Sequence, residues 1–306
     1  MFATILGPLP RPADATADDD AVRDVLARQE LAGLELLTDG GIGRPPATEI
    51  VRRLLAGESA GFVDAWQLAA GATTRAVKAV IPGPVTLGGG DDRRTLALAE
   101  ALNREAQALA SAGAPLIEIE EPGTVAIDDD AARDRFRRAH RRLTEGLEGT
   151  HLSLAVGGGN ADRAGVATFL AAPYASYAFD LRAGPDNWWL IAELPGDRGI
   201  VCGALSPLPG SDDGPELLVW AAHYAASTGG RGLDRVGLAN AVGLDGCDWP
   251  TLDRKLVRLA DAARLAAREN TAELARALDP RAINIRSAAA GRFVPRRRRP
   301  GDAPKT

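Results

Sequence analysis

Cysteine is scarce in this chain: Cys202 and Cys247 are the only two among 306 residues. Two thiols cannot build the multi-disulfide framework that stabilises small secreted domains. No run of about 18 apolar residues occurs, so the sequence predicts no membrane-spanning helix. The first residues lack a basic segment ahead of an apolar one, so no secretory signal is expected. Together these absences predict a reduced, cytoplasmic setting and no membrane partner.

Charge of one sign is also not in large excess, since the formal net charge is −5 with 45% hydrophobic residues. This mild acidity argues against a nucleic-acid partner. A chain of this length can bury one large core. The basic run Arg296–Arg299 stands among prolines, which predicts a solvated, disordered tail over 291–306 after a single domain spanning 1–290.

Stretches with the composition of strands alternate with stretches that have helical periodicity. The predicted strands are Phe2–Leu6, Leu34–Thr38, Ala76–Ile81, Leu116–Glu120, Thr150–Val156, Ala175–Leu181, Gly199–Leu205 and Leu233–Leu238. The predicted helices are Asp18–Ala32, Ala47–Ala72 with a break near Gly57, Thr95–Ala112, Asp129–Glu145, Ala161–Ala171, Pro185–Glu193, Pro215–Ser227 and Trp249–Leu278. Such alternation is typical of parallel strands joined by helical crossovers. Eight units in about 280 residues predict an α/β fold of the (β/α)8 TIM-barrel type, with eight parallel strands in one domain.

The fourth predicted strand places acidic side chains on one face. Ile117 and Ile119 share one side of the strand, and Glu118 and Glu120 share the other. Carboxylates are costly to bury in a dry core. The acids therefore face either solvent at a sheet edge or a polar cavity.

In a barrel of this type the functional site lies where the carboxyl ends of the strands meet. Acid–base chemistry there requires carboxyl or imidazole groups, and an arginine can hold a substrate carboxylate. We therefore predict Glu120, His151 and Asp180 as catalytic residues. The predicted substrate-binding residues are Asp39, Arg44, Glu118, Glu121, Ser153, Arg182 and Asn240.

Three other features allow two interpretations each. The loop Gly157–Asn160 could present backbone N–H groups to an anion, or it could be a tight turn. Trp188 and Trp189 could wall a pocket for a flat ligand such as a pterin, or pack on the rim. His140 and His223 lie on predicted helices and are interpreted as surface or helix-packing residues, and both cysteines as packing residues.

Several short blocks, in the same order, resemble the catalytic domain of cobalamin-independent methionine synthase. Val77–Thr86 is similar to that family's Lys…Gly-Pro-Val-Thr block, and Ile117–Pro122 is similar to its Ile-Gln-Ile-Asp-Glu-Pro block. The remaining blocks are Ala3–Pro12, Gln29–Gly40 and Val242–Leu244, the last followed by Lys255 and an alanine-rich helix. The resemblance runs from residue 2 to about residue 265 and implies a (β/α)8 barrel.

The resemblance also implies a chemistry, in which a zinc ion binds a thiol as thiolate and the thiolate takes a methyl group from a folate. The family's zinc ligands are a His-x-Cys pair, a Glu and a second Cys. In this chain His151 matches the histidine, and Ser153, Asp180 and Val242 stand at the other three positions. Serine and valine replace the two soft thiolates that favour zinc. If any residues bind a metal here, we expect His151 and Asp180, but we do not expect the family's zinc site.

Other departures affect the recognition of homocysteine. Gly41 stands where the family has a glutamate for the amino group, Pro8 replaces a serine, and Leu205 replaces a catalytic histidine. The sequence thus leaves three hypotheses open. The first is a diverged methyl- or alkyl-transferase acting on a thiol or related small molecule with a folate-type donor. The second is a metal-free lyase or decarboxylase, as in the uroporphyrinogen decarboxylase relatives, and the third is a non-catalytic small-molecule binder.

Overall fold

The computed structural model describes residues 1–211 and 214–268. Its strands are β1 Phe2–Ala3, β2 Leu36–Leu37, β3 Ala76–Val77, β4 Ala79–Pro82, β5 Ile117–Glu120, β6 Leu152–Val156, β7 Ser176–Asp180, β8 Gly199–Leu205 and β9 Val236–Asn240. Its α-helices are α1 Asp18–Ala32, α2 Ala47–Leu55, α3 Phe62–Gly71, α4 Pro84–Gly88, α5 Asp92–Ser111, α6 Asp130–Thr144, α7 Val166–Phe169, α8 Asn187–Glu193, α9 Pro215–Ser227 and α10 Trp249–Ala266. Short 3-10 turns are η1 Pro122–Ala126, η2 Asp162–Ala164, η3 Thr228–Gly230, η4 Leu233–Arg235 and η5 Leu244–Gly246.

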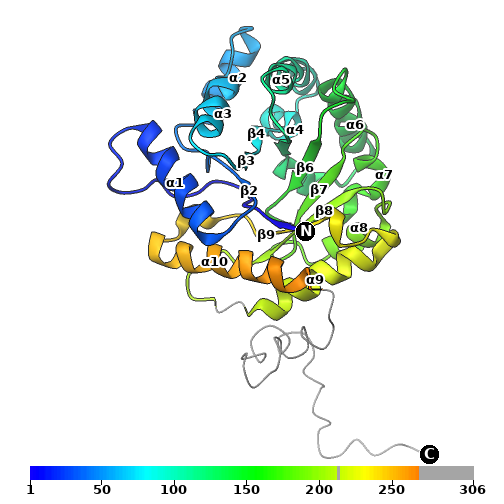
Figure 1. Cartoon of the computed structure of the whole chain (residues 1–306). Coiled ribbons are helices and arrows are strands. Elements are labelled where there is room, and N and C mark those ends of the chain that lie inside the picture. The colour runs from blue at the N-terminus through cyan, green and yellow to red at the C-terminus, as the bar shows by residue number, and fades with distance from the viewer. Residues whose placement is uncertain (212–213, 269–306) are drawn as a thin grey trace, which may run out of the picture.

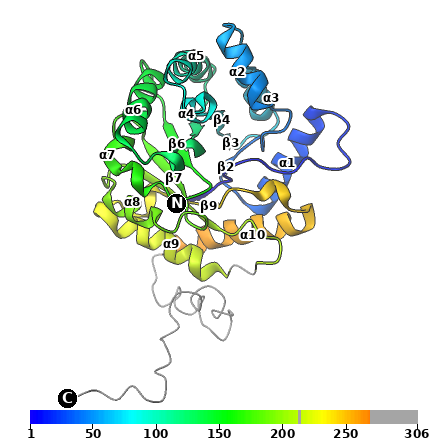
Figure 2. The same cartoon turned by 180° about the vertical axis from the view of Figure 1, so that it is seen from behind.

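The strands form a curled parallel sheet at the centre, and the helices surround it (Figure 1). Seven strands follow the order β1-β9-β8-β7-β6-β5-β4, and β2 pairs with β3 in a separate two-stranded sheet. All of these pairs are parallel, as the alternation of strands and helices predicted. The view from behind shows the same ring of helices around the strands (Figure 2).

The predicted closed ring of eight strands is not confirmed. The segment 76–82 belongs to both sheets, because β3 pairs with β2 and β4 pairs with β5. Over residues 1–211 and 214–268, however, no ladder joins β1 to β2. The Ala3 N–H instead donates to the Glu35 carboxylate at 2.8 Å. A side chain thus takes the donor that a strand-to-strand hydrogen bond would use.

Alternation of side chains divides the core into two clusters. Along β7, Ala178 belongs to a small cluster with Leu6, Ala155, Val201 and Ala239. Its neighbours Tyr177 and Phe179 belong to the large cluster that the helices cover. Because successive side chains of a strand point to opposite faces, the small cluster is the inside of the curled sheet.

Capping aspartates set the starts of three long helices. Asp91 accepts from the Arg94 N–H at the start of α5, Asp129 from the Ala132 N–H at α6, and Asp248 from the Thr251 N–H at α10. Each bond satisfies a donor that the first helical turn leaves unpaired. These caps fix where the crossover helices α5 and α6 and the last helix, α10, begin.

Most predicted elements are present with shifted bounds, and some differ. The predicted helix Ala161–Ala171 is split at Gly165, whose φ of 76° is not helical. Residues 233–235 form η4, so the last strand starts at Val236. The helix predicted to reach Leu278 ends at Ala266, with Ala267 as its C-cap. Residues 269–278 of that prediction and the predicted tail 291–306 lie outside the described residues. No helix among the described residues is long and apolar enough to cross a membrane.

Candidate functional site

The sheet has an open seam on the carboxyl side of β2. The last ladder bond between β2 and the next strand runs from the Lys78 N–H to the Leu37 carbonyl, at 3.0 Å. Beyond it the chain turns away through Asp39 and two left-handed glycines, Gly40 and Gly41, while β4 continues to Pro82. The carbonyl groups of β4 on this side therefore need other partners.

Arg44 bridges the seam. Its Nη2 donates to the Val80 carbonyl at 3.4 Å, and its Nη1 donates to Glu120 Oε2 at 3.0 Å. Both side chains of the ion pair are about a fifth exposed, at 22% and 23%. The predicted catalytic carboxylate and a predicted substrate-binding arginine therefore meet at the carboxyl ends of β4 and β5.

Below this pair lies a second, buried ion pair. Lys78 Nζ is 2.7 Å from Glu118 Oε1 and donates to the Ile5 carbonyl at 2.7 Å. The two side chains are 0% and 2% exposed. Burial raises the pKa of Glu118, and the charge of Lys78 opposes that rise. Glu118 thus faces the interior of the curled sheet, and its carboxylate is paired with Lys78. It lies neither at a solvent-exposed edge nor free in a polar cavity, the two placements that the alternation left open.

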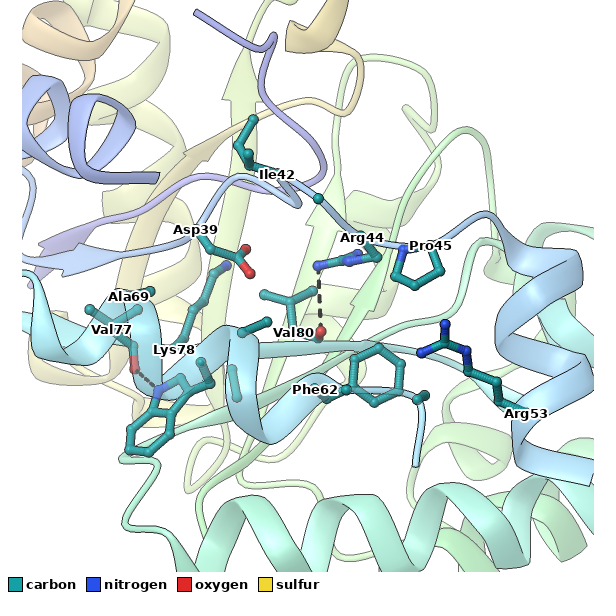
Figure 3. Close-up of a pocket in the computed structure, with 16 residues that line it drawn as sticks. Asp39, Ile42, Arg44, Pro45, Arg53, Phe62, Ala69, Val77, Lys78 and Val80 are labelled. Atoms are coloured by element: carbon teal, nitrogen blue, oxygen red, sulfur yellow. Dashed lines mark hydrogen bonds between the residues drawn. The ribbon is translucent and has the colours of Figure 1, made fainter. Parts of the chain in front are cut away.

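A cavity of about 300 Å³ adjoins the seam between β4, α2 and α3 (Figure 3). We call it the seam cavity; its lining includes Asp39, Ile42, Arg44, Arg53, Phe62, Ala65, Trp66, Ala69, Val77, Lys78 and Val80. Figure 3 shows Arg44 above Val80, the Phe62 ring below Arg44, and the Lys78 side chain directed toward Asp39. Charged and apolar side chains thus line the same cavity.

Glu121 does not belong to this site, although it was predicted to bind substrate. Its carboxylate is fully buried and accepts from the Val85 N–H at 2.9 Å and the Thr86 N–H at 2.6 Å. The Thr86 hydroxyl also bonds it, and His140 Nε2 lies 3.1 Å away. His140 Nδ1 is in turn 2.6 Å from the Tyr174 hydroxyl. Glu121 therefore anchors the Gly83–Thr86 turn from outside the sheet.

Two other predicted residues have backbone partners. Asp180 Oδ1 accepts from the N–H groups of Arg182 and Ala183 at 2.9 Å each, and Oδ2 accepts from the Gly158 N–H at 3.3 Å. The Asn240 amide bonds both the N–H and the carbonyl of Leu6, at 3.0 and 2.8 Å. Asp180 thus shapes the loop after β7, and Asn240 ties the chain beyond β1 to β9. Arg182 is exposed on the Asp180 loop.

Ser153 lies inside the sheet on β6, opposite Glu118 in the ladder. Its hydroxyl is buried, and no partner for it is found among the described residues. It is one strand away from the Lys78–Glu118 pair and closed off from the seam cavity.

The predicted placement of His151 beside Glu120 and Asp180 is wrong. His151 precedes the first residue of β6, so it lies at the amino end of the sheet, opposite to the end where Glu120 lies. It is exposed there, its Nε2 is 2.9 Å from Ser176 Oγ, and it lines a different cavity with Phe2 and Arg235. Partial desolvation lowers the pKa of His151. It therefore cannot share a proton-transfer site with Glu120.

The residues at the family's ligand positions do not fit a zinc ion. Val242 is apolar and partly exposed, and a Cβ placed on Gly157 would lie only 2.3 Å from Val242 Cγ2. The valine therefore fills the space at the end of β6. His151 is at the far end, and Asp180 is bonded to backbone N–H groups. Among the described residues no three His, Cys, Asp or Glu side chains are grouped as a metal site needs.

The thiols offer no replacement for the lost ligands. Cys202 is fully buried, which raises its pKa to about 12, and burial also raises the pKa of Cys247. Among the described residues, neither thiol belongs to a group of three His, Cys, Asp or Glu side chains that could hold a metal. Both cysteines are packing residues, as predicted.

Lys78 is the residue that the sequence reasoning missed. It stood in the Val77–Thr86 block, but no role was given to it. Its signal was available, because Lys78 and Val80 are two apart on a strand and so share the face that meets Glu118. A lysine and a glutamate on the same face of neighbouring parallel strands, placed diagonally to each other, predict a buried ion pair.

The chain matches no protein-family model, and no curated protein sequence matches it. Its structure is similar to a B12-independent methionine synthase from Shewanella sp. W3-18-1 in complex with selenomethionine, with a TM-score of 0.72, 17% identity, and coverage of 86% of this chain and 96% of that one. It is also similar to a Listeria monocytogenes protein described as a vitamin-B12-independent methionine synthase, with a TM-score of 0.67 and 16% identity over 87% of this chain and 96% of that one. A third similar structure is a methyltransferase from Methanosarcina mazei, with a TM-score of 0.59 and 13% identity over 86% of this chain and 94% of that one. At these identities the likeness is one of fold, which supports the resemblance seen in the sequence at that level.

Proposed function

We propose that this protein is a metal-independent acid–base enzyme that acts on a small carboxylic acid. The observation that carries the proposal is the Arg44–Glu120 pair, 3.0 Å apart and partly exposed beside the seam cavity. Arginine presents several N–H donors in one plane, a geometry that suits carboxylates. Arg44 uses two of its nitrogens in the bonds described above, so further donors remain for a ligand.

In the proposed mechanism the substrate carboxylate takes the place of Glu120 on Arg44. Glu120 then loses its cationic partner, so its carboxylate is free to act on the substrate. The freed carboxylate accepts a proton from the substrate, and the resulting acid returns that proton to the product. The buried Lys78–Glu118 pair fixes β4 and β5, which carry Val80 and Glu120.

A second candidate is methyl or alkyl transfer to a thiol, which the structural likeness to a methyltransferase and two methionine synthase-type proteins favours. Without soft metal ligands, the thiol would need a base to become nucleophilic, and Glu120, beside the seam cavity, is a carboxylate that could serve. Thiols and a folate-type donor, tested for turnover beside small carboxylic acids, distinguish the two candidates. Binding without turnover of any compound would favour a non-catalytic binder.

We expect Arg44→Gln to weaken the binding of a small carboxylate such as hexanoate by about 10- to 100-fold, the value of a charge-assisted hydrogen bond. Titration calorimetry or ligand-observed NMR measures this. Arg104→Gln is the matched control, because Arg104 is 58% exposed on α5. Equal affinity of Arg44→Gln and the native protein would overturn the assignment of Arg44.

Glu120→Gln separates binding from chemistry. It keeps the shape of the side chain but cannot take up a proton, so hexanoate binding should persist or strengthen as Arg44 loses its competing partner. Turnover of any substrate found by screening should fall by at least about 100-fold, the contribution of a positioned acid–base group. A variant with full turnover would remove Glu120 from the mechanism.

A further inference from the structure

The seam cavity is amphipathic. Three of its charged side chains, Arg44, Lys78 and Asp39, lie at the end toward the sheet, and a fourth, Arg53, comes from α2. The wall formed by α3 carries Phe62 and Trp66. The Trp66 indole N–H donates to the Val77 carbonyl at 2.9 Å. With its polar atom satisfied by the backbone, the indole has only its ring carbons to offer the cavity.

Small residues on α3 create the space. Ala65 and Ala69 line the cavity along α3 together with the larger Phe62 and Trp66. The Ala60 N–H before this helix is held by Glu105 at 2.9 Å, which fixes the start of α3 relative to α5. A volume of about 300 Å³ is at the lower end of the range for small-molecule sites. The wall is thus preformed and apolar.

We propose that the seam cavity holds the aliphatic chain of a monocarboxylate whose head group lies at Arg44. This assignment of the substrate class rests on the proposed function above. Of the lining cations, Lys78 is already paired with the buried Glu118, and Arg53 is paired with Glu49. A carboxylate head group is therefore expected at Arg44, which keeps further N–H donors for a ligand. A chain attached to that carboxylate has Phe62, Ala65 and Trp66 beyond it.

The test is the affinity of the full-length protein for acetate, butyrate and hexanoate, measured by ligand-observed NMR. Each methylene group that enters an apolar wall should increase affinity about fourfold, so that each two-carbon step gives roughly 16-fold. Hexanamide, which keeps the chain but lacks the charge, should bind at least about 10-fold more weakly than hexanoate. Intermolecular NOEs from the hexanoate methyl group should reach the Phe62 and Trp66 rings.

Ala65→Phe fills the cavity and should remove the dependence on chain length while leaving acetate binding intact. Ala108→Phe places the same side chain on the exposed face of α5 and should change nothing. Ala65→Leu provides a milder filling variant if the phenylalanine prevents folding. The native protein alone already decides the matter, because equal affinities for the three acids would overturn the proposal.

The outcomes also separate this proposal from the proposed function. Binding that depends on Arg44 but not on chain length would contradict the placement of the aliphatic chain in the seam cavity. It would leave the proposed roles of Arg44 and Glu120 unchanged. Binding that depends on chain length and is changed by Ala65→Phe, but not by Arg44→Gln, would support the seam cavity as the site of the chain. It would contradict the assignment of the carboxylate to Arg44. NOEs from the hexanoate methyl group to residues outside the seam cavity would contradict the placement of the chain there.

Discussion

Lys78→Met should destabilise the fold strongly, by about 3–5 kcal/mol, because it leaves the Glu118 carboxylate buried without its cation. The two side chains are 0% and 2% exposed, so water cannot replace the lost partner. The Ile5 carbonyl also loses the Lys78 hydrogen bond. For a chain of this size we expect Tm to fall by roughly 6–15 °C in a calorimetric scan.

The double variant Lys78→Met with Glu118→Leu tests the cause. Replacing both charges with apolar groups of similar size is often neutral in a protein interior, so it should recover much of the lost stability. Arg104→Met, which breaks a pair that is more than half exposed on both sides, is the control and should leave Tm nearly unchanged. A single variant as stable as the native protein would show that the ion pair is not closed to water.

Glu121→Gln should have the second largest effect. The carboxylate accepts from two backbone N–H groups and a hydroxyl and lies beside His140, all at a fully buried position. A glutamine amide has one acceptor oxygen, so at least one buried donor loses its partner, at a cost of about 1–3 kcal/mol each. Tm should fall accordingly, measured beside Glu145→Gln, an exposed glutamate at the end of α6.

The same variant should also affect the site. Glu121 holds the turn that starts α4, and it directly follows Glu120. Loosening that turn should therefore weaken hexanoate binding without removing any contact to the ligand. Unchanged stability would contradict the anchoring role, and lost stability with unchanged binding would show that the turn is independent of the site.

The alternating pattern of β5 carried real information about the site. Residues 117–120 were expected to alternate, and Ile117 and Ile119 are indeed buried in the outer core while Glu118 faces inward. Periodicity could not extend to Glu121, because the strand ends at Glu120 and the next residue turns to the outside. Its partners come from residue 85 and from α6, far away in sequence.

His151 shows where motif spacing failed. The predicted strand Thr150–Val156 already put His151 near the amino end, but His151 was grouped with the residues at the carboxyl ends of the strands, and the resemblance to a His-x-Cys pair then matched it to a ligand. The residues at the carboxyl end of β6 are Ala155, Val156 and Gly157, none of which is a metal donor. The position of His151 within its strand therefore predicted its location better than the motif did.

The open seam could not be predicted from the sequence. Leu34–Thr38 has the composition of a full strand, but only Leu36 and Leu37 pair with a neighbour. The pairing stops because the chain leaves through Asp39, Gly40 and Gly41, and Arg44 takes over the Val80 carbonyl. A long-range hydrogen bond of this kind has no periodic signature.

We expect the site to work without the zinc ion of the family that this chain resembles. The most direct test is the metal content of the full-length protein by plasma mass spectrometry, together with hexanoate binding before and after treatment with EDTA. We expect zinc far below one ion per chain and the same hexanoate affinity in both samples. One zinc per chain that resists EDTA, or binding that is lost with the metal, would contradict the account.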